Sequence, residues 1–183
     1  GDMEQAKQIV GDAAALGTLS GNIYDRIHLG LVGALIARHE RDAVTAARMA
    51  AEARQLAEGQ ALVSYHVLAT AIEATARVEA GDVQSGVLLA TTALGAVEAM
   101  EGSEYGILVR SLCCAAVIRA VSRDAFGTTP TMMADVCRRS LDHIDKVAGY
   151  IRDPGVRQRF FERASVKFVV ENATRGAASR GSG

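Results

Sequence analysis

The sequence predicts an all-α fold built from a repeated helical hairpin, and three observations lead to this prediction. Hydrophobic residues make up 49% of the 183 residues, while aromatic residues make up only 4%. Alanine supplies much of that hydrophobic share, and alanine is the strongest intrinsic helix former. The chain has only two prolines, Pro130 and Pro154, so long stretches contain no helix breaker. A turn pattern of Gly or Arg followed by Asp recurs every forty residues, at 1–2, 41–42 and 81–82.

Each of these turns is expected to begin a helix. The Asp carboxylate can accept hydrogen bonds from the N–H groups of the first turn, and the residue before it can end the preceding helix in a left-handed conformation. Small residues then recur at spacings of four and three, which places them on one side of the helix, where two backbones can approach closely. The aligned sets are Ala6/Val10/Ala13, Ala46/Ala50/Ala53 and Gly86/Ala90/Ala93.

Another helix, the first of each hairpin, is predicted before each later turn, over residues 22–40, 61–80 and 105–122. A helix, a tight turn and a returning helix form the unit of an α-solenoid. A fourth and looser copy begins at 123–124 and has a longer loop, so this turn is predicted to span 123–131. Thr129 or Thr131 is expected to cap the helix that begins near Pro130.

A closing helix is predicted over about residues 154–172. Phe161, Phe168 and Val169 would form its apolar face and cover the open end of the stack, which an α-solenoid requires. Nine basic and five acidic residues over 138–175 also allow a nucleic-acid contact, but a cap helix with a solvated basic face is preferred. The repeat domain is therefore expected to span 1–173, followed by a flexible tail over 174–183.

The segment 79–86 (Glu-Ala-Gly-Asp-Val-Gln-Ser-Gly), with Ala90 and Ala93, resembles the second half of a tetratricopeptide repeat. The resemblance covers about residues 1–150. It departs from the family because the early aromatic residue and the closing proline are missing, and because the repeat is longer than the usual length of about 34. It implies a right-handed superhelix of seven or eight helices, similar to the elongated repeats of large multidomain bacterial transcriptional and signalling regulators.

The resemblance also implies a function. We expect a non-catalytic, cytoplasmic interaction domain, a fragment of a larger bacterial regulator, that binds a peptide or protein segment in the concave groove lined by its first helices. The groove candidates are the polar or aromatic residues on those helices: Tyr24, Arg26, His28, Tyr65, His66, Arg77 and Arg110. Phe126, in the longer loop, is a further contact candidate, and the alternative is that this loop is a tolerated insertion.

Two other functions remain as hypotheses. The chain could be a sensor domain that encloses a small molecule or a signalling peptide. It could also be a self-association module, because it starts in the middle of a repeat and would leave an apolar N-terminal edge open to a second copy.

Catalysis and cofactor binding have no support in the sequence. The four histidines lack metal-ligand spacing, and His39 fits a solvated helix end. The three cysteines, Cys113, Cys114 and Cys137, form no even disulfide set, and two of them lie in an apolar run that predicts buried, inert thiols. A net charge of −1 gives no overall attraction to nucleic acid or membrane, and no apolar run is long enough for a membrane span. We therefore expect no enzyme activity, no metal, no cofactor and no membrane contact.

Overall fold

The computed structural model describes residues 2–100, 102–123 and 129–178, and throughout these ranges its regular structure is helical. This confirms the all-α prediction. The helices are α1 (Asp2–Ser20), α2 (Ile23–His39), α3 (Ala43–Gly59), α4 (Val63–Ala80), α5 (Val83–Glu98), α6 (Gly106–Ser122), α7 (Pro130–Tyr150), α8 (Pro154–Glu162) and α9 (Ala164–Ala178).

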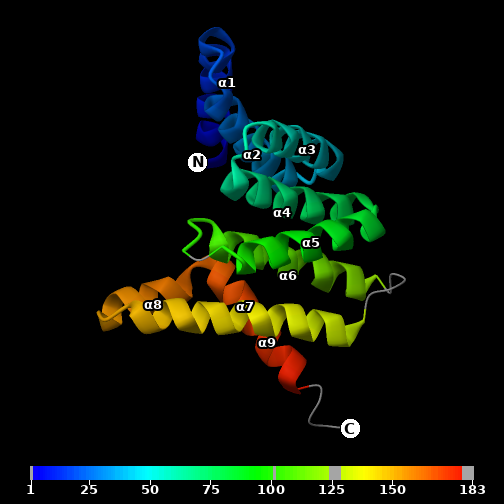
Figure 1. The fold of residues 1–183 in the computed structure, drawn as a ribbon, viewed down its shortest axis with the longest axis vertical. Helices are drawn as coiled ribbons and strands as arrows, with labels where there is room; N and C mark the ends of the chain where they lie inside the picture. Colours follow the sequence, from blue (N-terminus) through cyan, green and yellow to red (C-terminus); the bar gives the residue numbers. More distant parts are fainter. Residues whose placement is uncertain (1, 101, 124–128, 179–183) are drawn as a thin grey trace.

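The helices from α2 to α7 lie in successive layers, as Figure 1 shows. Each packs against the next in the chain, and α4 also contacts α2 and α6, so the helix that precedes one turn touches its counterparts in the neighbouring hairpins. At the N-terminal end, α1 packs mainly against α2 and extends beyond the stack (Figure 1). These contacts bring side chains about forty residues apart in sequence onto the same part of the molecule.

The small-residue positions are where the helices approach one another. Ala46, Ala50 and Ala53 on α3 are buried, as are Gly86 and Ala90 on α5. A Cβ atom added at Gly86 would lie 2.8 Å from the carbonyl oxygen of Ala74 and 2.5 Å from a methyl carbon of Val78. Only glycine fits at this contact, so its place in the repeat has a packing reason.

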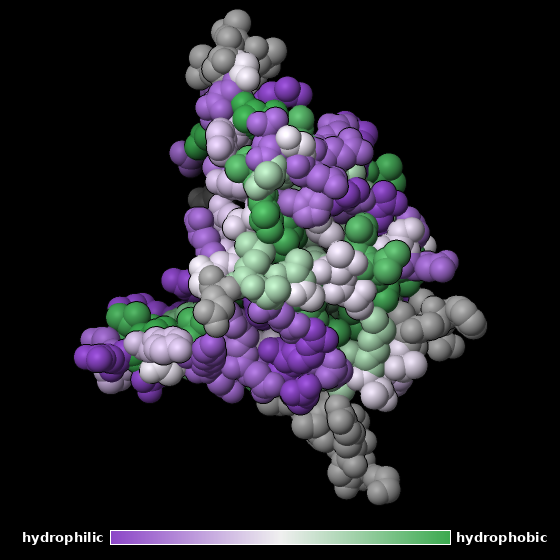
Figure 2. All heavy atoms as spheres, in the orientation of Figure 1, coloured by the Kyte–Doolittle hydropathy of each residue, from purple (hydrophilic) through white to green (hydrophobic). Residues whose placement is uncertain are grey.

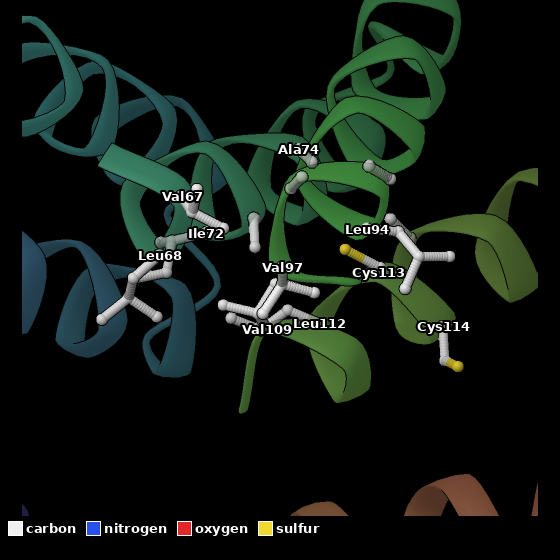
Figure 3. Close-up of a cluster of buried hydrophobic side chains, with 14 of the residues drawn as sticks. Val67, Leu68, Ile72, Ala74, Leu94, Val97, Val109, Leu112, Cys113 and Cys114 are labelled. Atoms are coloured by element: carbon white, nitrogen blue, oxygen red, sulfur yellow. The ribbon is translucent and has the colours of Figure 1, made fainter. Parts of the chain in front are cut away.

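Larger side chains complete the core between α4, α5 and α6. Figure 3 shows Ile72, Leu94, Val97, Val109 and Leu112 gathered there. Every residue of α4 from Val67 to Ala76 is buried, because this helix is covered from several sides. The centre of the stack is therefore α4, and side chains on its exposed ends are held on a rigid support.

The residues before Asp42 and Asp82 adopt the expected left-handed conformation, and one of the two is not glycine. Gly81 has φ 102° and ends α4 in the left-handed region, as predicted. Arg41 takes the same place at the end of α2 with φ 68°, although a residue with a Cβ is disfavoured there. Ala61 adopts φ 55° after α3, which places the left-handed residue two positions beyond Gly59.

The predicted capping residues behave differently from one another. The Asp42 carboxylate accepts a hydrogen bond from the backbone N–H of Thr45 at 3.0 Å, which confirms its role. The Thr129 hydroxyl accepts one from the N–H of Met132 at 3.1 Å, with proline at the first position of α7. Asp82 stands at the start of α5, where its carboxylate pairs with Arg77, and hydrogen bonding with Ser85 followed by Arg77 lowers its pKa.

The closing segment differs from the prediction of one helix, since it forms two, α8 and α9, separated at Arg163. Phe160, Val166 and Val169 are all buried. On one continuous helix, Phe160 and Val166 would point about 120° apart, because successive residues turn by roughly 100°. The extended backbone at Arg163 (ψ 132°) allows both to face the core, and it raises the number of helices from the expected seven or eight to nine among the described residues.

Helix α9 extends past residue 174, where the tail was expected to begin. Helix α9 packs against α7 and α6 and continues to Ala178. Alanine is the best helix former, and this offsets the cost of about 1 kcal/mol for the one glycine in that stretch.

Candidate functional site

Three side chains from three successive hairpins form a row, which we call the aromatic row: His28 on α2, Tyr65 on α4, and Tyr105 just before α6. The hydroxyl of Tyr65 lies 2.9 Å from Nε2 of His28, and the two rings meet edge to face with centroids 4.9 Å apart. The rings of Tyr65 and Tyr105 are 5.8 Å apart and tilted by 49°. The row thus crosses the helices instead of following one of them.

The fold positions the row through the N-terminal ends of these helices. Asn22 caps α2 by accepting a hydrogen bond from the N–H of Tyr24 at 3.0 Å, which fixes the first turn from which His28 follows. Tyr65 lies in the first turn of α4, and Tyr105 is the residue from which α6 starts. Because α4 contacts both α2 and α6, the three ends are adjacent.

The row is graded from exposed to half-buried. His28 is exposed, whereas Tyr65 and Tyr105 are half-buried. Burial, and then a hydrogen bond with Tyr65, raise the pKa of the Tyr105 hydroxyl to about 12. Tyr105 is therefore neutral at physiological pH, and the hydroxyl groups of both tyrosines can donate or accept hydrogen bonds.

A buried cation lies beside the row. Arg110 on α6 is only 4% exposed, and its Nη1 donates to the carbonyl of Gly106 at 3.2 Å. Its Nε has no hydrogen-bond partner among the described residues, and burial lowers the pKa of the guanidinium. His143 on α7 is close by, since its Nε2 and Nη1 of Arg110 both lie about 3.5 Å from the position that a Cβ of Gly106 would take. Burial and then the charge of Arg110 lower the pKa of His143.

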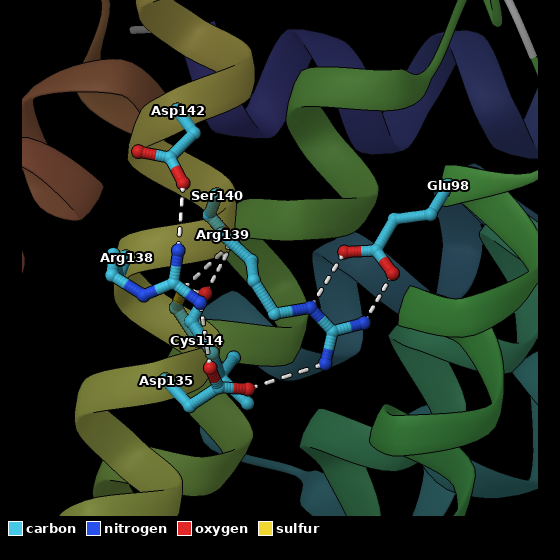
Figure 4. A network of polar contacts seen from close by, with 8 residues as sticks. Glu98, Cys114, Asp135, Arg138, Arg139, Ser140 and Asp142 are labelled. Carbon is cyan, nitrogen blue, oxygen red and sulfur yellow. Dashed lines mark hydrogen bonds and ion pairs between the residues drawn. The ribbon is translucent and has the colours of Figure 1, made fainter.

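Acidic and basic residues on α7 and at the end of α5 are paired with each other (Figure 4). Arg139 on α7 donates from Nε to Glu98 on α5 at 2.9 Å and also contacts Asp135 at 3.3 Å. Arg138 bridges Asp135 and Asp142, both at 2.9 Å. This network ties α7 to α5, and Figure 2 shows hydrophilic residues gathered over α7. The carboxylates in it are occupied by structural contacts.

The other predicted groove residues are dispersed. Arg77 is half-buried and is held by Glu73 and Asp82, at 2.7 and 2.8 Å. Tyr24 and Arg26 are exposed near the start of α2. Phe126 lies outside the described residues.

His66 follows Tyr65 but belongs to a different feature. It lines a pocket of about 190 Å³ with Ala57, Leu62 and Val63, and its buried Nδ1 has no hydrogen-bond partner in the described chain. The structure thus joins two of the seven groove candidates, His28 and Tyr65, in one row, and places Arg110 close to its end.

Two residues of this region were missed in the sequence. Tyr105 is the first residue of the helix predicted over 105–122 and stands at the N-cap of α6, and His143 is on the returning helix α7. The only available signal for Tyr105 was the presence of an aromatic residue at the start of two consecutive first helices, Tyr65 and Tyr105, in a chain with just four tyrosines.

The row offers aromatic rings, two hydroxyl groups and an imidazole. Within the described ranges, no three His, Cys, Asp or Glu side chains are grouped so that they could hold a metal ion. All three cysteines are buried and reduced, and burial raises the pKa of the Cys113 thiol to about 12. In the part of the chain that the structure describes, every helix is too short or too polar to cross a membrane.

Compared with protein-family models, with curated proteins and with solved structures, the chain matches none.

Proposed function

We propose that the chain is a non-catalytic binding domain with tetratricopeptide-like superhelical repeats, and that it holds an extended segment of another protein across the aromatic row. The observation that carries this proposal is that His28, Tyr65 and Tyr105 come from three successive hairpins, and that Tyr65 contacts the other two rings. A module of this kind suits a regulatory or signalling protein.

An extended segment fits the row better than a globular partner does. The row runs across the helices, so a peptide laid along it would meet one ring from each hairpin in turn. Tyrosine and histidine combine an apolar ring with a polar tip, so they can pack against side chains and also hydrogen-bond to peptide groups. Tyr65 is on α4, and α4 packs against α2 and α6, which carry the other two rings; this packing holds the row in place before binding and lowers the entropic cost of association.

Two of the arginines among the groove candidates are engaged by contacts within the fold. Arg77 is occupied by Glu73 and Asp82, and Arg110 is buried beneath the surface. We infer that these two residues support the helices that carry the row, while Tyr24 and Arg26 extend the row at its exposed end.

The test is a peptide-display selection against the immobilised chain, followed by affinity measurements on the selected peptides. Tyr65→Ala and Tyr105→Ala should each weaken binding by about tenfold or more, as expected for central aromatic contacts. The matched control is Tyr150→Ala, because Tyr150 lies on α7 and is 74% exposed. Its loss should change the affinity by less than about twofold. Equal affinities of Tyr65→Ala and the unaltered chain, with the fold intact by circular dichroism, would refute the proposal.

A further inference from the structure

An open pocket of about 520 Å³ lies at the opposite ends of the first helices from the aromatic row. We call it the arginine pocket. Its polar lining comes from the ends of α2, α4 and α6 and from the turn before α3: Arg38, His39, Arg41, Glu79, Arg119 and Arg123. His28 and Arg38 are ten residues apart on α2, so the pocket is about 15 Å from the row along that helix.

The positive charges in the pocket exceed the negative ones. Glu79 is shared between two arginines, with its carboxylate oxygens 2.9 Å from Nε of Arg38 and 3.3 Å from Nε of Arg119. Arg123 donates to the backbone carbonyls of Val78 and Glu79 at the end of α4. The guanidinium of Arg41 makes no hydrogen bond or ion pair within the described part of the chain. Among the lining residues that the structure describes, four guanidinium groups therefore face a single carboxylate.

Helix ends do not cancel this excess. The C-termini of α2, α4 and α6 contribute a partial charge of about −0.5 each, and the N-terminus of α3 contributes about +0.5. For the described lining residues, three formal positive charges remain after Glu79 is counted, which exceeds the net partial charge of about −1 from the helix ends. The pKa of Arg119 reflects the same imbalance: burial lowers it first, and repulsion from Arg38, Arg41 and Arg123 lowers it further against the opposing effect of Glu79.

The turn does not explain the presence of Arg41. Its φ of 68° lies in the left-handed region, which costs a residue with a Cβ about 1 kcal/mol. At the matching place one hairpin later stands Gly81, in the same region with no such cost. Ala61 also takes this region, but its side chain carries no polar group, whereas Arg41 brings a guanidinium to the lining of the open pocket.

We propose that the arginine pocket binds a small polyanion, a molecule with two or more neighbouring phosphate or carboxylate groups. Guanidinium groups bind such oxygens through paired, charge-assisted hydrogen bonds. The volume falls in the range of roughly 300–1,000 Å³ that is typical of small-molecule sites. A ligand here would join the ends of α2, α4 and α6, so its binding would couple three successive hairpins.

Isothermal titration calorimetry at about 50 mM salt, where screening is weak, tests the proposal with two probes, pyrophosphate and citrate. At least one should bind, and Arg119→Gln and Arg41→Gly should each weaken it by roughly tenfold to hundredfold. The matched control is Arg48→Gln on α3, which removes the same charge from an exposed residue that pairs with Glu52 outside the pocket. It should change the affinity by less than about twofold.

Arg41→Gly separates binding from folding. Glycine relieves the left-handed strain, so this variant should melt at the same temperature as the unaltered chain or higher, and its loss of affinity cannot come from unfolding. Binding of pyrophosphate alone assigns phosphate groups to the ligand, and binding of citrate alone assigns carboxylates. The proposal is overturned if neither probe binds, or if Arg48→Gln weakens binding as much as Arg41→Gly. Tyr65→Ala should leave the affinity for the probe unchanged, so this test is independent of the aromatic row.

Discussion

The contact between α4 and α5 at Gly86 gives the sharpest prediction about stability. A Cβ at this position would meet two backbone atoms of α4, the carbonyl oxygen of Ala74 at 2.8 Å and the amide nitrogen of Val78 at 3.0 Å. Neither can turn away as a flexible side chain could, so the two helices must separate. Overpacking of this kind costs about 3 kcal/mol, at the upper end of its usual range, because backbone must move. The gain in helix propensity from glycine to alanine returns about 1 kcal/mol.

Gly86→Ala should therefore lower the free energy of unfolding by about 2 kcal/mol. The matched control lies in the same helix: at Gly95 an added Cβ meets nothing within 4 Å, so Gly95→Ala should stabilise the chain by about 1 kcal/mol. Each variant adds one methyl group to the unaltered chain. Gly86→Ala should lower the melting temperature by about 4–8 °C, and Gly95→Ala should raise it by about 2–4 °C.

The assay is urea denaturation followed by far-ultraviolet circular dichroism, with the slope of the transition checked for constancy between variants. If Gly86→Ala proves as stable as Gly95→Ala, the close approach of α4 and α5 is wrong, and with it the packing role of small residues in the repeat.

Three further predictions concern buried polar groups. Glu73 is 1% exposed and forms ion pairs with Arg54 and Arg77, at 2.7 Å each. Glu73→Gln should therefore lower the free energy of unfolding, measured in urea, by about 3 kcal/mol. The control Glu52→Gln, at an exposed ion pair, should lower it by about 0.5 kcal/mol or less. The pKa of His143 is lower in the folded chain than its ordinary value, so the unfolded state takes up this proton first and stability should fall as the pH drops below about 6.5. A His143→Gln variant should lose less stability than the unaltered chain between pH 6.5 and 5, and an equal loss would contradict the burial of this ring beside Arg110. The native chain should not react with a thiol reagent at pH 8, because Cys113, Cys114 and Cys137 are buried and the pKa of Cys113 is raised to about 12. In denaturant, all three thiols should react. Rapid labelling of the native chain would argue against that burial.

The fold was predictable from the sequence to the extent that it depends on local signals. The forty-residue recurrence of Asp42 and Asp82, with small residues at fixed distances after them, located the first and second helices of the hairpins within about two residues. The break at Arg163 was not predictable in this way, because it depends on which face of the stack Phe160 and Val166 must both reach.

The sites were less accessible to sequence reasoning for a related reason. Both are made by contacts between hairpins, at separations of about forty or eighty residues. His28 and Tyr65 could be chosen by side-chain type, but their contact with Tyr105 depends on how the N-terminal ends of three helices align. The arginine pocket was hidden because Arg38 and Arg119 look like ordinary basic residues at helix ends until Glu79 is found between them.

The central claim is that a partner segment lies across the aromatic row, and hydrogen exchange measured on the chain with and without a display-selected peptide tests it most directly. Bound peptide should slow exchange at the N-terminal ends of α2, α4 and α6, where His28, Tyr65 and Tyr105 lie, and should leave the outer turns of α3 and α5 unchanged. Protection confined to α3 and α5, with none near Tyr65, would show that the partner binds the other helices of the hairpins and would contradict the account.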